Sequence, residues 1–234
     1  MAPIAPSVPA AELATLLRDS RHWELLRERQ AKETRRLVYR VNEQFLVKKF
    51  EMSHAIQRYR RPWLIEDACL RRLNGDGAPR SFGWYEVIEG DNRVVWLVKD
   101  FIDGEPVVAF TLDDLPAVAH LLASIHARGV ITDDASAGNF LRVPDGRLVF
   151  LDFGRARLRS KNRRCSAETI GWALAKLRRE GFNWEKSLWE AFLPLYFSCL
   201  GASTWQRTRI RAACSAATRL RQTRKILQGQ SPRS

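Results

Sequence analysis

Three oxygen-bearing side chains flank a short predicted hairpin in this chain of 234 residues. Two apolar stretches, residues 140–141 and 148–151, have strand character and are joined by a Pro-Asp-Gly turn. Asp134 and Asn139 precede the first stretch, and Asp152 follows the second. A hairpin of this length returns its end to its beginning, so we expect the three side chains to converge. Hard oxygen ligands around one point indicate Mg²⁺, and Mg²⁺ with few protein ligands indicates a bound phosphate.

The spacing of these residues resembles the catalytic and metal motifs of protein-kinase-like enzymes. Asn139 follows Asp134 by five positions, and Asp152 begins an intact Asp-Phe-Gly. Residues 134–141 resemble the D-L-H-P-G-N-F-L stretch of bacterial small-substrate kinases more than the version in eukaryotic protein kinases. The resemblance implies that Asp134 is the catalytic base and that Asn139 and Asp152 are the ligands of Mg²⁺.

A kinase site also needs a lysine on a strand that reaches the phosphates of the nucleotide. Residues 45–48, Phe-Leu-Val-Lys, form a strand-like run that ends in a cation. Strand alternation places Leu46 and Lys48 on one face, so Leu46 can touch an adenine while Lys48 reaches the phosphates. Lys49 points to the opposite face, which favours Lys48 as the nucleotide-binding lysine.

A carboxylate on a helix normally holds this lysine in place. Residues 63–73 have helical character, and Glu66 lies in the first turns of that helix. Glu66 is therefore predicted to pair with Lys48. The adjacent Asp67 is an alternative partner, and a solvated helix carboxylate is the alternative interpretation of Glu66.

Three stretches together resemble the lipopolysaccharide core kinases, the Kdo and heptose kinase group with a RIO-like or aminoglycoside-phosphotransferase-like kinase fold. Residues 32–48 look like the second and third strands of that family, and residues 98–104 look like its hinge. Residues 124–154 look like its helix, catalytic loop and metal motif. The resemblance implies an enzyme that uses ATP and Mg²⁺ to phosphorylate a sugar hydroxyl, on a heptose or Kdo of the lipopolysaccharide inner core.

The same resemblance implies an α+β fold of the bilobal protein-kinase-like type. We expect a small antiparallel, five-stranded sheet in the N-lobe and a mainly helical C-lobe. The predicted segments are a flexible N-terminal arm and helix over residues 1–20, an N-lobe over 21–100, a C-lobe over 101–203 and a basic C-terminal helix and tail over 204–234.

The resemblance also implies where a nucleotide would bind. ATP is expected between the lobes, with its adenine between Leu46 above and Leu141 below. Backbone contacts to the adenine are expected near Asp100 and Ile102. The predicted lysine–glutamate pair would grip the phosphates.

The catalytic loop departs from the family pattern in two ways. Thr132-Asp133-Asp134 stands in place of His-Gly-Asp, and Ser136 stands where family members often keep a second histidine. Asp133 adds a carboxylate beside the base, which would raise its proton affinity by like-charge repulsion. The loop expected to cover the phosphates, residues 30–36, contains no glycine. Two alternatives therefore stay open, a RIO-like protein kinase and a catalytically inactive pseudokinase scaffold.

Positive charge is concentrated in the C-terminal part of the chain. The net charge is +13, and residues 155–234 hold 18 Lys plus Arg against 4 Asp plus Glu. Residues 205–234 form a basic segment with apolar residues at helical spacing, which fits an anionic membrane, nucleic-acid phosphates or a solvated face. A lipopolysaccharide precursor is acidic and membrane-bound. We therefore favour the precursor and the anionic inner-membrane surface as partners over nucleic acid.

Other sequence features favour a cytoplasmic enzyme, peripheral on the inner face of the inner membrane. No run reaches the roughly 18 apolar residues that span a bilayer. Residues 1–10 lack the basic region and the apolar core of a signal peptide. The four cysteines are scattered without a C-x-x-C pair, which is typical of free thiols in a reducing compartment.

Overall fold

The computed structural model describes residues 9–31, 34–53, 61–160 and 165–227. The chain divides into two compact units, Met1–Asp103 and Gly104–Ser234, and each is described by itself. The tip of the predicted phosphate-covering loop, residues 32–33, lies outside the described residues. The same holds for parts of the predicted N-terminal arm and basic tail, residues 1–8 and 228–234.

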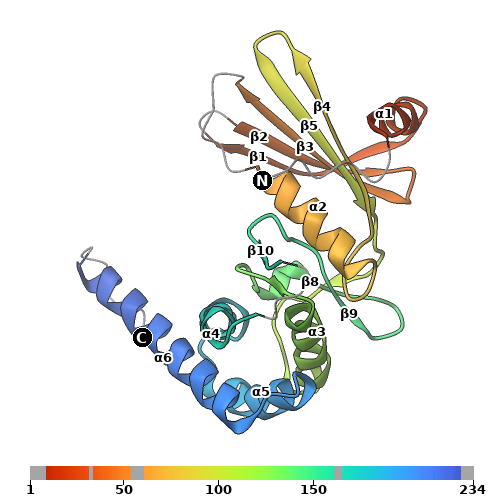
Figure 1. The fold of residues 1–234 in the computed structure, drawn as a ribbon. Helices are drawn as coiled ribbons and strands as arrows, with labels where there is room; N and C mark the ends of the chain where they lie inside the picture. Colours follow the sequence, from red (N-terminus) through yellow and green to blue (C-terminus); the bar gives the residue numbers. More distant parts are fainter. Residues whose placement is uncertain (1–8, 32–33, 54–60, 161–164, 228–234) are drawn as a thin grey trace. The chain divides into compact units, whose positions relative to one another are not determined.

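The first unit is built on a five-stranded antiparallel sheet with the strand order β1-β2-β3-β5-β4 (Figure 1). The antiparallel sheet of five strands predicted from the sequence is therefore present. Two helices, α1 (Ala10–Arg18) and α2 (Pro62–Leu73), accompany it. The strands are β1 (Trp23–Ala31), β2 (Thr34–Val41), β3 (Phe45–Ser53), β4 (Ser81–Glu89) and β5 (Asn92–Asp100).

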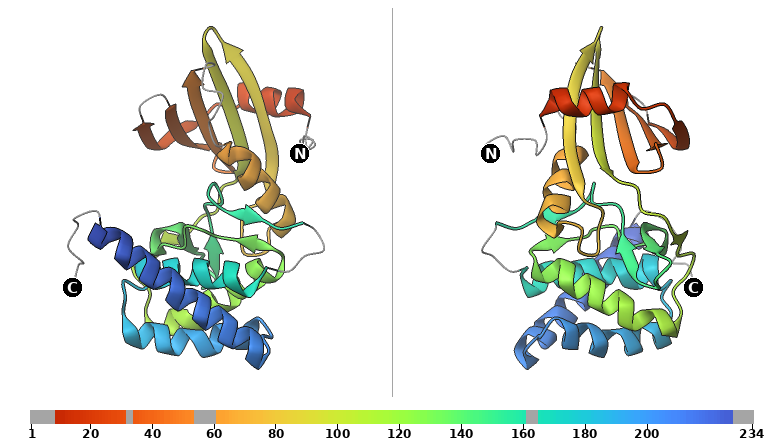
Figure 2. Two further views of the ribbon diagram at one scale, coloured as in Figure 1. Left: turned by 60° about the vertical axis from the view of Figure 1, so that its left-hand side comes forward. Right: turned by 90° about the vertical axis from the view of Figure 1, so that its right-hand side faces the viewer.

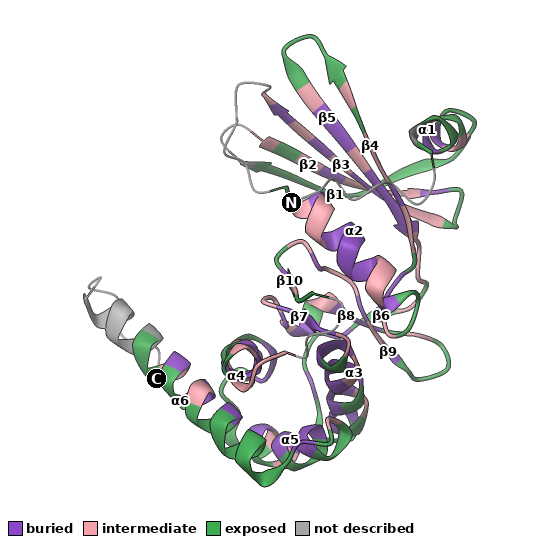
Figure 3. Cartoon of the chain, viewed as in Figure 1, coloured by how far each residue is buried: buried purple, intermediate pink, exposed green. Residues whose placement is uncertain are grey.

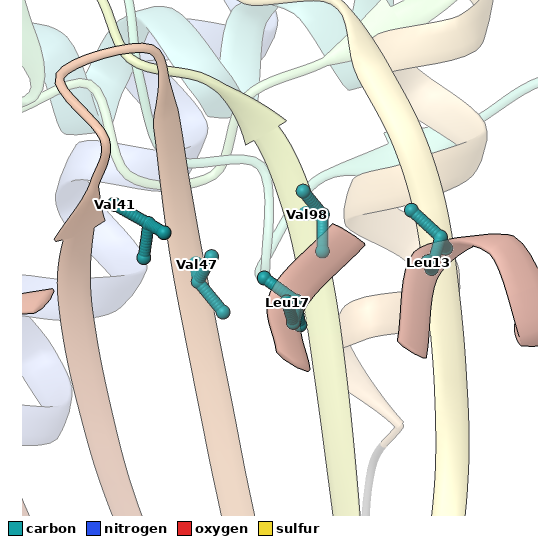
Figure 4. Packing of buried hydrophobic residues seen from close by; sticks show 5 residues of the cluster. All are labelled: Leu13, Leu17, Val41, Val47 and Val98. Carbon is teal, nitrogen blue, oxygen red and sulfur yellow. The ribbon is translucent and has the colours of Figure 1, made fainter. Parts of the chain in front are cut away.

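Successive side chains of a strand point to opposite faces of a sheet. One face of this sheet packs on α1. Val41, Val47 and Val98 form an apolar cluster there with Leu13 and Leu17 of α1 (Figure 4). All five side chains are buried. Because Val47 and Val98 point toward α1, their neighbours along β3 and β5 point to the opposite face of the sheet.

The opposite face of the sheet packs on α2. Phe50 and Leu97 cluster there with Trp63 of α2. The helix ends where Asn74 adopts a left-handed conformation with φ 49° and ψ 47°, which asparagine tolerates better than most residues. Lys48 is adjacent to Val47 in β3, so its side chain belongs to the α2 face.

The second unit combines helices with two small sheets (Figure 1). The predicted hairpin is β8 (Phe140–Arg142) and β9 (Leu148–Phe150), with β6 (Glu105–Pro106) alongside β8, and β7 (Val130–Ile131) pairs with β10 (Arg157–Leu158). The helical elements are η1 (Leu112–Asp114), α3 (Leu115–Ala127), η2 (Ala137–Asn139), α4 (Ala167–Lys176), the π-helical turn η3 (Leu177–Gly181), α5 (Lys186–Cys199) and α6 (Thr204–Leu227). Among the described residues, no helix is both long enough and apolar enough to cross a membrane.

Helix α6 contains most of the predicted basic segment and packs along α4 (Figure 2). Ile210, Cys214 and Ala217 are buried, whereas most other described positions of α6 are exposed (Figure 3). Gly171 of α4 permits the close approach, since a Cβ at this position would lie 2.6 Å from the Cβ of Ala213. The apolar edge of the basic helix is therefore used for packing within the second unit.

Candidate active site

Lys48 of β3 and Glu66 of α2 form a buried ion pair. The Lys48 Nζ donates hydrogen bonds to Glu66 Oε1 at 2.7 Å and Oε2 at 2.8 Å. Glu66 is 0% exposed and Lys48 is 4% exposed. The ion pair expected from the sequence is thus present in the first unit, while its part in nucleotide binding stays a prediction.

The sequence neighbours of this pair have other contacts. The Nζ of Lys49 lies 2.5 Å from Glu51 Oε1 and 4.8 Å from the ring centre of Trp96. The carboxylate of Asp67 accepts a hydrogen bond from Ser81 Oγ at 2.6 Å. Glu66, and not the alternative Asp67, is therefore the carboxylate that meets the strand lysine.

A second lysine, Lys99 of β5, joins the pair and was not predicted. Its Nζ donates to Glu66 Oε1 at 2.7 Å, and Lys99 is 1% exposed. The register explains the meeting, since Leu46 lies opposite Lys99 and Lys48 lies opposite Leu97. Both lysines consequently leave the sheet on the α2 face. Strand alternation along β5, which puts Leu97 and Lys99 on one face, is the signal that could have placed Lys99.

The end of β5 and the residues after it include the predicted adenine contacts. The backbone N–H of Asp100 donates to the Arg80 carbonyl at 3.0 Å, and the Asp100 carboxylate accepts from Arg80 Nε at 2.9 Å. The N–H of Phe101 donates to the Gln44 carbonyl at 2.8 Å. The N–H of Asp100 is therefore already hydrogen-bonded within the first unit, and the backbone contact of an adenine near Asp100 stays a prediction. Ile102 is half-buried and stays the second predicted contact.

Asp134 and Asn139 are brought together by the loop before β8. The Nδ2 of Asn139 donates to the backbone carbonyl of Asp134 at 2.6 Å. This bond occupies the amide nitrogen, so the amide oxygen is the atom that can serve as a metal ligand. The Asp134 carboxylate is 27% exposed and lies 3.4 Å from Lys176 Nζ and 3.6 Å from an Arg155 nitrogen.

The β8–β9 hairpin brings Asp152 to the same loop. The N–H of Leu151 donates to the Asn139 carbonyl at 2.9 Å, and Asp152 is the next residue. The Asp152 Oδ1 accepts the N–H of Gly154 at 3.0 Å. An amide oxygen and a carboxylate are hard ligands of the kind that Mg²⁺ takes when phosphate oxygens complete its shell. The donor set of the second unit therefore fits Mg²⁺.

Lys176 and Arg157 were missed by the sequence analysis and determine the charge around the loop. The Lys176 Nζ also donates to the carbonyl of Asp133. The Asp133 carboxylate pairs with Arg157 of β10 through contacts of 2.8 and 2.9 Å. Asp133 is therefore charge-compensated and does not stand as an isolated carboxylate beside Asp134, as the sequence had led us to expect.

Leu141, the other predicted adenine contact, lies in β8 and is 6% exposed. It lies opposite Val149 of β9 and Pro106 of β6. Gly104 approaches it so closely that a Cβ there would lie 3.1 Å from Leu141 Cδ2. Leu46 belongs to the first unit and Leu141 to the second, and their common contact with an adenine stays a prediction.

Comparison with known proteins gives a distant relationship. No protein-family model matches the chain. A segment of 135 residues is 28% identical to the serine/threonine-protein kinase PknA of Mycobacterium tuberculosis, and equally to PknA of Mycobacterium bovis. The match covers 52% of this chain and 30% of the length of these relatives. This distant similarity to a protein kinase supports a protein-kinase-like fold and phosphotransferase chemistry, for which ATP and Mg²⁺ are the usual requirements.

Proposed function

We propose that this protein is an ATP-dependent kinase that transfers a phosphoryl group to an alcohol hydroxyl. The observation that carries the proposal is the buried ion pair of Lys48 with Glu66. Burial of two charges costs several kcal/mol of desolvation per ion and is seldom recovered as stability, which favours a functional reason for the pair. A lysine held by a helix carboxylate is the arrangement that grips nucleotide phosphates in kinases.

Each residue of the candidate site has a chemical role in this proposal. Lys48, held by Glu66, would bind the nucleotide phosphates, and Asn139 and Asp152 would hold Mg²⁺. The bound Mg²⁺ would neutralise charge on the phosphates during transfer. Asp134 would orient the acceptor hydroxyl and take its proton while the hydroxyl oxygen bonds to the γ-phosphorus and ADP leaves.

The acceptor in this proposal is a heptose or Kdo hydroxyl of the lipopolysaccharide inner core. Support comes from the resemblance of residues 98–104 and 124–154 to core kinases and from the excess of positive charge after residue 154. An acidic, membrane-bound acceptor fits such a charge distribution. The enzyme would then work in the cytoplasm, peripherally on the inner face of the inner membrane.

The packing of α6 defines how this enzyme would meet an anionic surface. Because the apolar edge of the helix packs on α4, attachment would depend on exposed arginines and not on apolar insertion. Arg209 pairs with Glu168, and Arg211 lies 5.4 Å from the ring centre of Phe197, so part of the charge is engaged locally. A basic residue that lies near an anionic membrane surface contributes about 1 kcal/mol to the free energy of attachment. Salt screens this attraction.

Two other candidates have support from specific observations. A protein acceptor is favoured by the similarity to the serine/threonine kinase PknA. An inactive scaffold is favoured by Thr132, which stands in place of the family histidine. Thr132 is 2% exposed, and its hydroxyl has no hydrogen-bond partner within the part of the chain that the structure describes.

Transfer of labelled phosphate from ATP tests these candidates in one experiment. Purified core-deficient lipopolysaccharide and a protein substrate are offered in parallel, with and without Mg²⁺. Asp152→Ala and Asn139→Ala are each expected to abolish Mg²⁺-dependent turnover. Without a metal ligand, Mg²⁺ no longer neutralises the negative charge of the phosphates. Labelling of the protein substrate alone would favour the protein kinase, and Mg·ATP binding without transfer to either acceptor would favour the scaffold.

A further inference from the structure

Lys48 and Lys99 converge on one oxygen of Glu66. Each Nζ lies 2.7 Å from Oε1, and Lys48 also reaches Oε2 at 2.8 Å. The side chains of the two lysines are 6% and 2% exposed, and that of Glu66 is 0% exposed. The cluster is therefore a carboxylate that is shared by two buried ammonium groups.

A single lysine–glutamate pair would face a conflict in a phosphate-binding site. When the lysine turns to a phosphate, a buried carboxylate loses charge-assisted hydrogen bonds, and its desolvation is left uncompensated. The cost of this separation would be subtracted from the affinity for the nucleotide. A second ammonium group that stays on the carboxylate removes much of the cost.

We infer that Lys99 is a positioning residue that keeps Glu66 charge-compensated and so allows Lys48 to engage the phosphates of a nucleotide. This inference rests on the proposed nucleotide-binding role of Lys48. Lys99 and Lys48 come from neighbouring strands that pair in register, whereas Glu66 comes from the helix that covers their common face. Lys99 can therefore hold Glu66 from the sheet independently of Lys48.

Because both lysines contact Glu66, the sharing of this carboxylate can be tested by stability measurements without any ligand. Lys48→Met and Lys99→Met each leave one ammonium group on Glu66, so each variant is expected to unfold at a urea concentration near that of the wild type. The double variant leaves Glu66 without either lysine. Its loss of stability is expected to exceed the sum of the two single losses, as expected for residues that share one partner.

Nucleotide binding supplies the second measurement. Mg·ATP and inorganic tripolyphosphate are titrated against the wild type and the variants. Lys48→Met is expected to lose binding, and Lys99→Met is expected to bind about tenfold more weakly, because Lys48 alone must then neutralise Glu66. Lys99→Arg keeps the charge and is expected to restore part of the affinity. Lys49→Met is the matched control, since Lys49 neighbours Lys48 but contacts Glu51 on the other face of β3.

The outcomes separate this inference from the proposed function. Additive losses in the double variant, or failure of Lys99→Met to fold while Lys48→Met folds, would show that Lys99 is an ordinary structural lysine. Equal affinity of Lys99→Met and wild type would overturn the positioning role even if the kinase proposal stands. If the wild type binds neither Mg·ATP nor tripolyphosphate, the kinase proposal fails together with the positioning role. The double variant would then still decide whether the two lysines share Glu66.

Discussion

Lysine contacts a carboxylate at two of the predicted functional residues, Glu66 and Asp134, and the two contacts differ in burial. Around Glu66, two lysines approach to 2.7 Å, and the three side chains are at most 6% exposed. Around Asp134, Lys176 and Arg155 stay at 3.4 and 3.6 Å, and the carboxylate is 27% exposed. Lysine–carboxylate contacts are therefore short and buried at Glu66 in the first unit, and longer and partly exposed at Asp134 in the second.

The difference in burial corresponds to the different tasks that we propose. Charges with little exposure interact strongly and are costly to separate, whereas partly exposed charges are screened by solvent. The burial of Glu66 with Lys99 suits the proposed task of keeping the carboxylate in place while Lys48 engages phosphates. The partial exposure of Asp134 suits the proposed task of meeting an acceptor hydroxyl and taking its proton. Three predictions test this distinction, and a fourth concerns a buried neutral pair in the second unit.

The largest effect is expected on folding. Glu66→Ala should lower the free energy of unfolding by about 3–5 kcal/mol, because two buried lysines lose their shared carboxylate. Asp134→Ala should change it by less than about 1 kcal/mol, because that carboxylate is partly exposed. Urea denaturation of both variants measures the difference. Equal losses in the two variants would remove the distinction between the clusters.

Turnover should depend strongly on Asp134, although stability depends on it little. Asp134→Ala should lower kcat by about 10²–10⁴-fold, the usual contribution of a general base, with nucleotide affinity close to wild type. Asp145→Ala is the matched control, since Asp145 lies in the exposed turn of the same hairpin and pairs with Arg147. Single-turnover assays with whichever acceptor the labelled-phosphate experiment identifies provide the rates. A loss of nucleotide affinity in Asp134→Ala that equals its loss of turnover would contradict the assigned role.

Features with a local cause could be predicted from the sequence. The hairpin around residues 140–150 followed from apolar stretches and turn chemistry, and the helix over residues 63–73 followed from its periodicity. Period-two alternation in one strand put Lys48 on the correct face. The ion pair with Glu66 then required only that this helix cover that face, as a kinase-like fold implies.

Features that depend on the packing of distant segments could not be predicted in this way. Lys99 reaches Glu66 across 33 positions, and Lys176 reaches Asp133 and Asp134 across 43 and 42 positions. These contacts arise from the register of β3 with β5 and from the place of α4 beside the loop. Alternation along β5 puts Lys99 on the same face as Leu97, but periodicity within one segment does not show which carboxylate covers that face.

A pH effect on stability is expected from the interior of the second unit, which contains a neutral polar pair. His126 is buried, with its Nδ1 2.6 Å from the Tyr196 hydroxyl oxygen. Burial lowers the pKa of His126 to about 3, from an ordinary value of 6.5. The unfolded chain therefore takes up a proton below about pH 6.5, while the folded chain does so only near pH 3. Stability should fall with decreasing pH in this window, by up to about 1.4 kcal/mol per pH unit.

The measurement is urea denaturation between pH 7 and pH 4 on the wild type and on two variants of α3. His126→Gln should flatten the pH dependence in this range, although its stability at pH 7 should be lower because the packing against Tyr196 changes. His120→Gln, at an exposed position of the same helix, should keep the wild-type slope. An unchanged slope in His126→Gln would show that other groups cause the acid sensitivity.

The smallest of the four effects is expected at the exposed edge of the Asp134 cluster. Lys176 has a side chain that is 13% exposed and contacts both the Asp133 carbonyl and the Asp134 carboxylate, so it restrains the loop and the base together. Lys176→Met should therefore lower kcat by about tenfold, equivalent to about 1.4 kcal/mol, with little change in nucleotide affinity. Arg155→Met is the matched control, because the Arg155 side chain is 62% exposed and its contact with Asp134 is 3.6 Å, so its effect should be within about twofold. Raising the salt concentration should diminish any effect of Arg155 before that of Lys176, since exposed charges are screened first. If both variants lose kcat equally, the half-buried lysine has no special role, and the cluster around Asp134 is a general electrostatic environment.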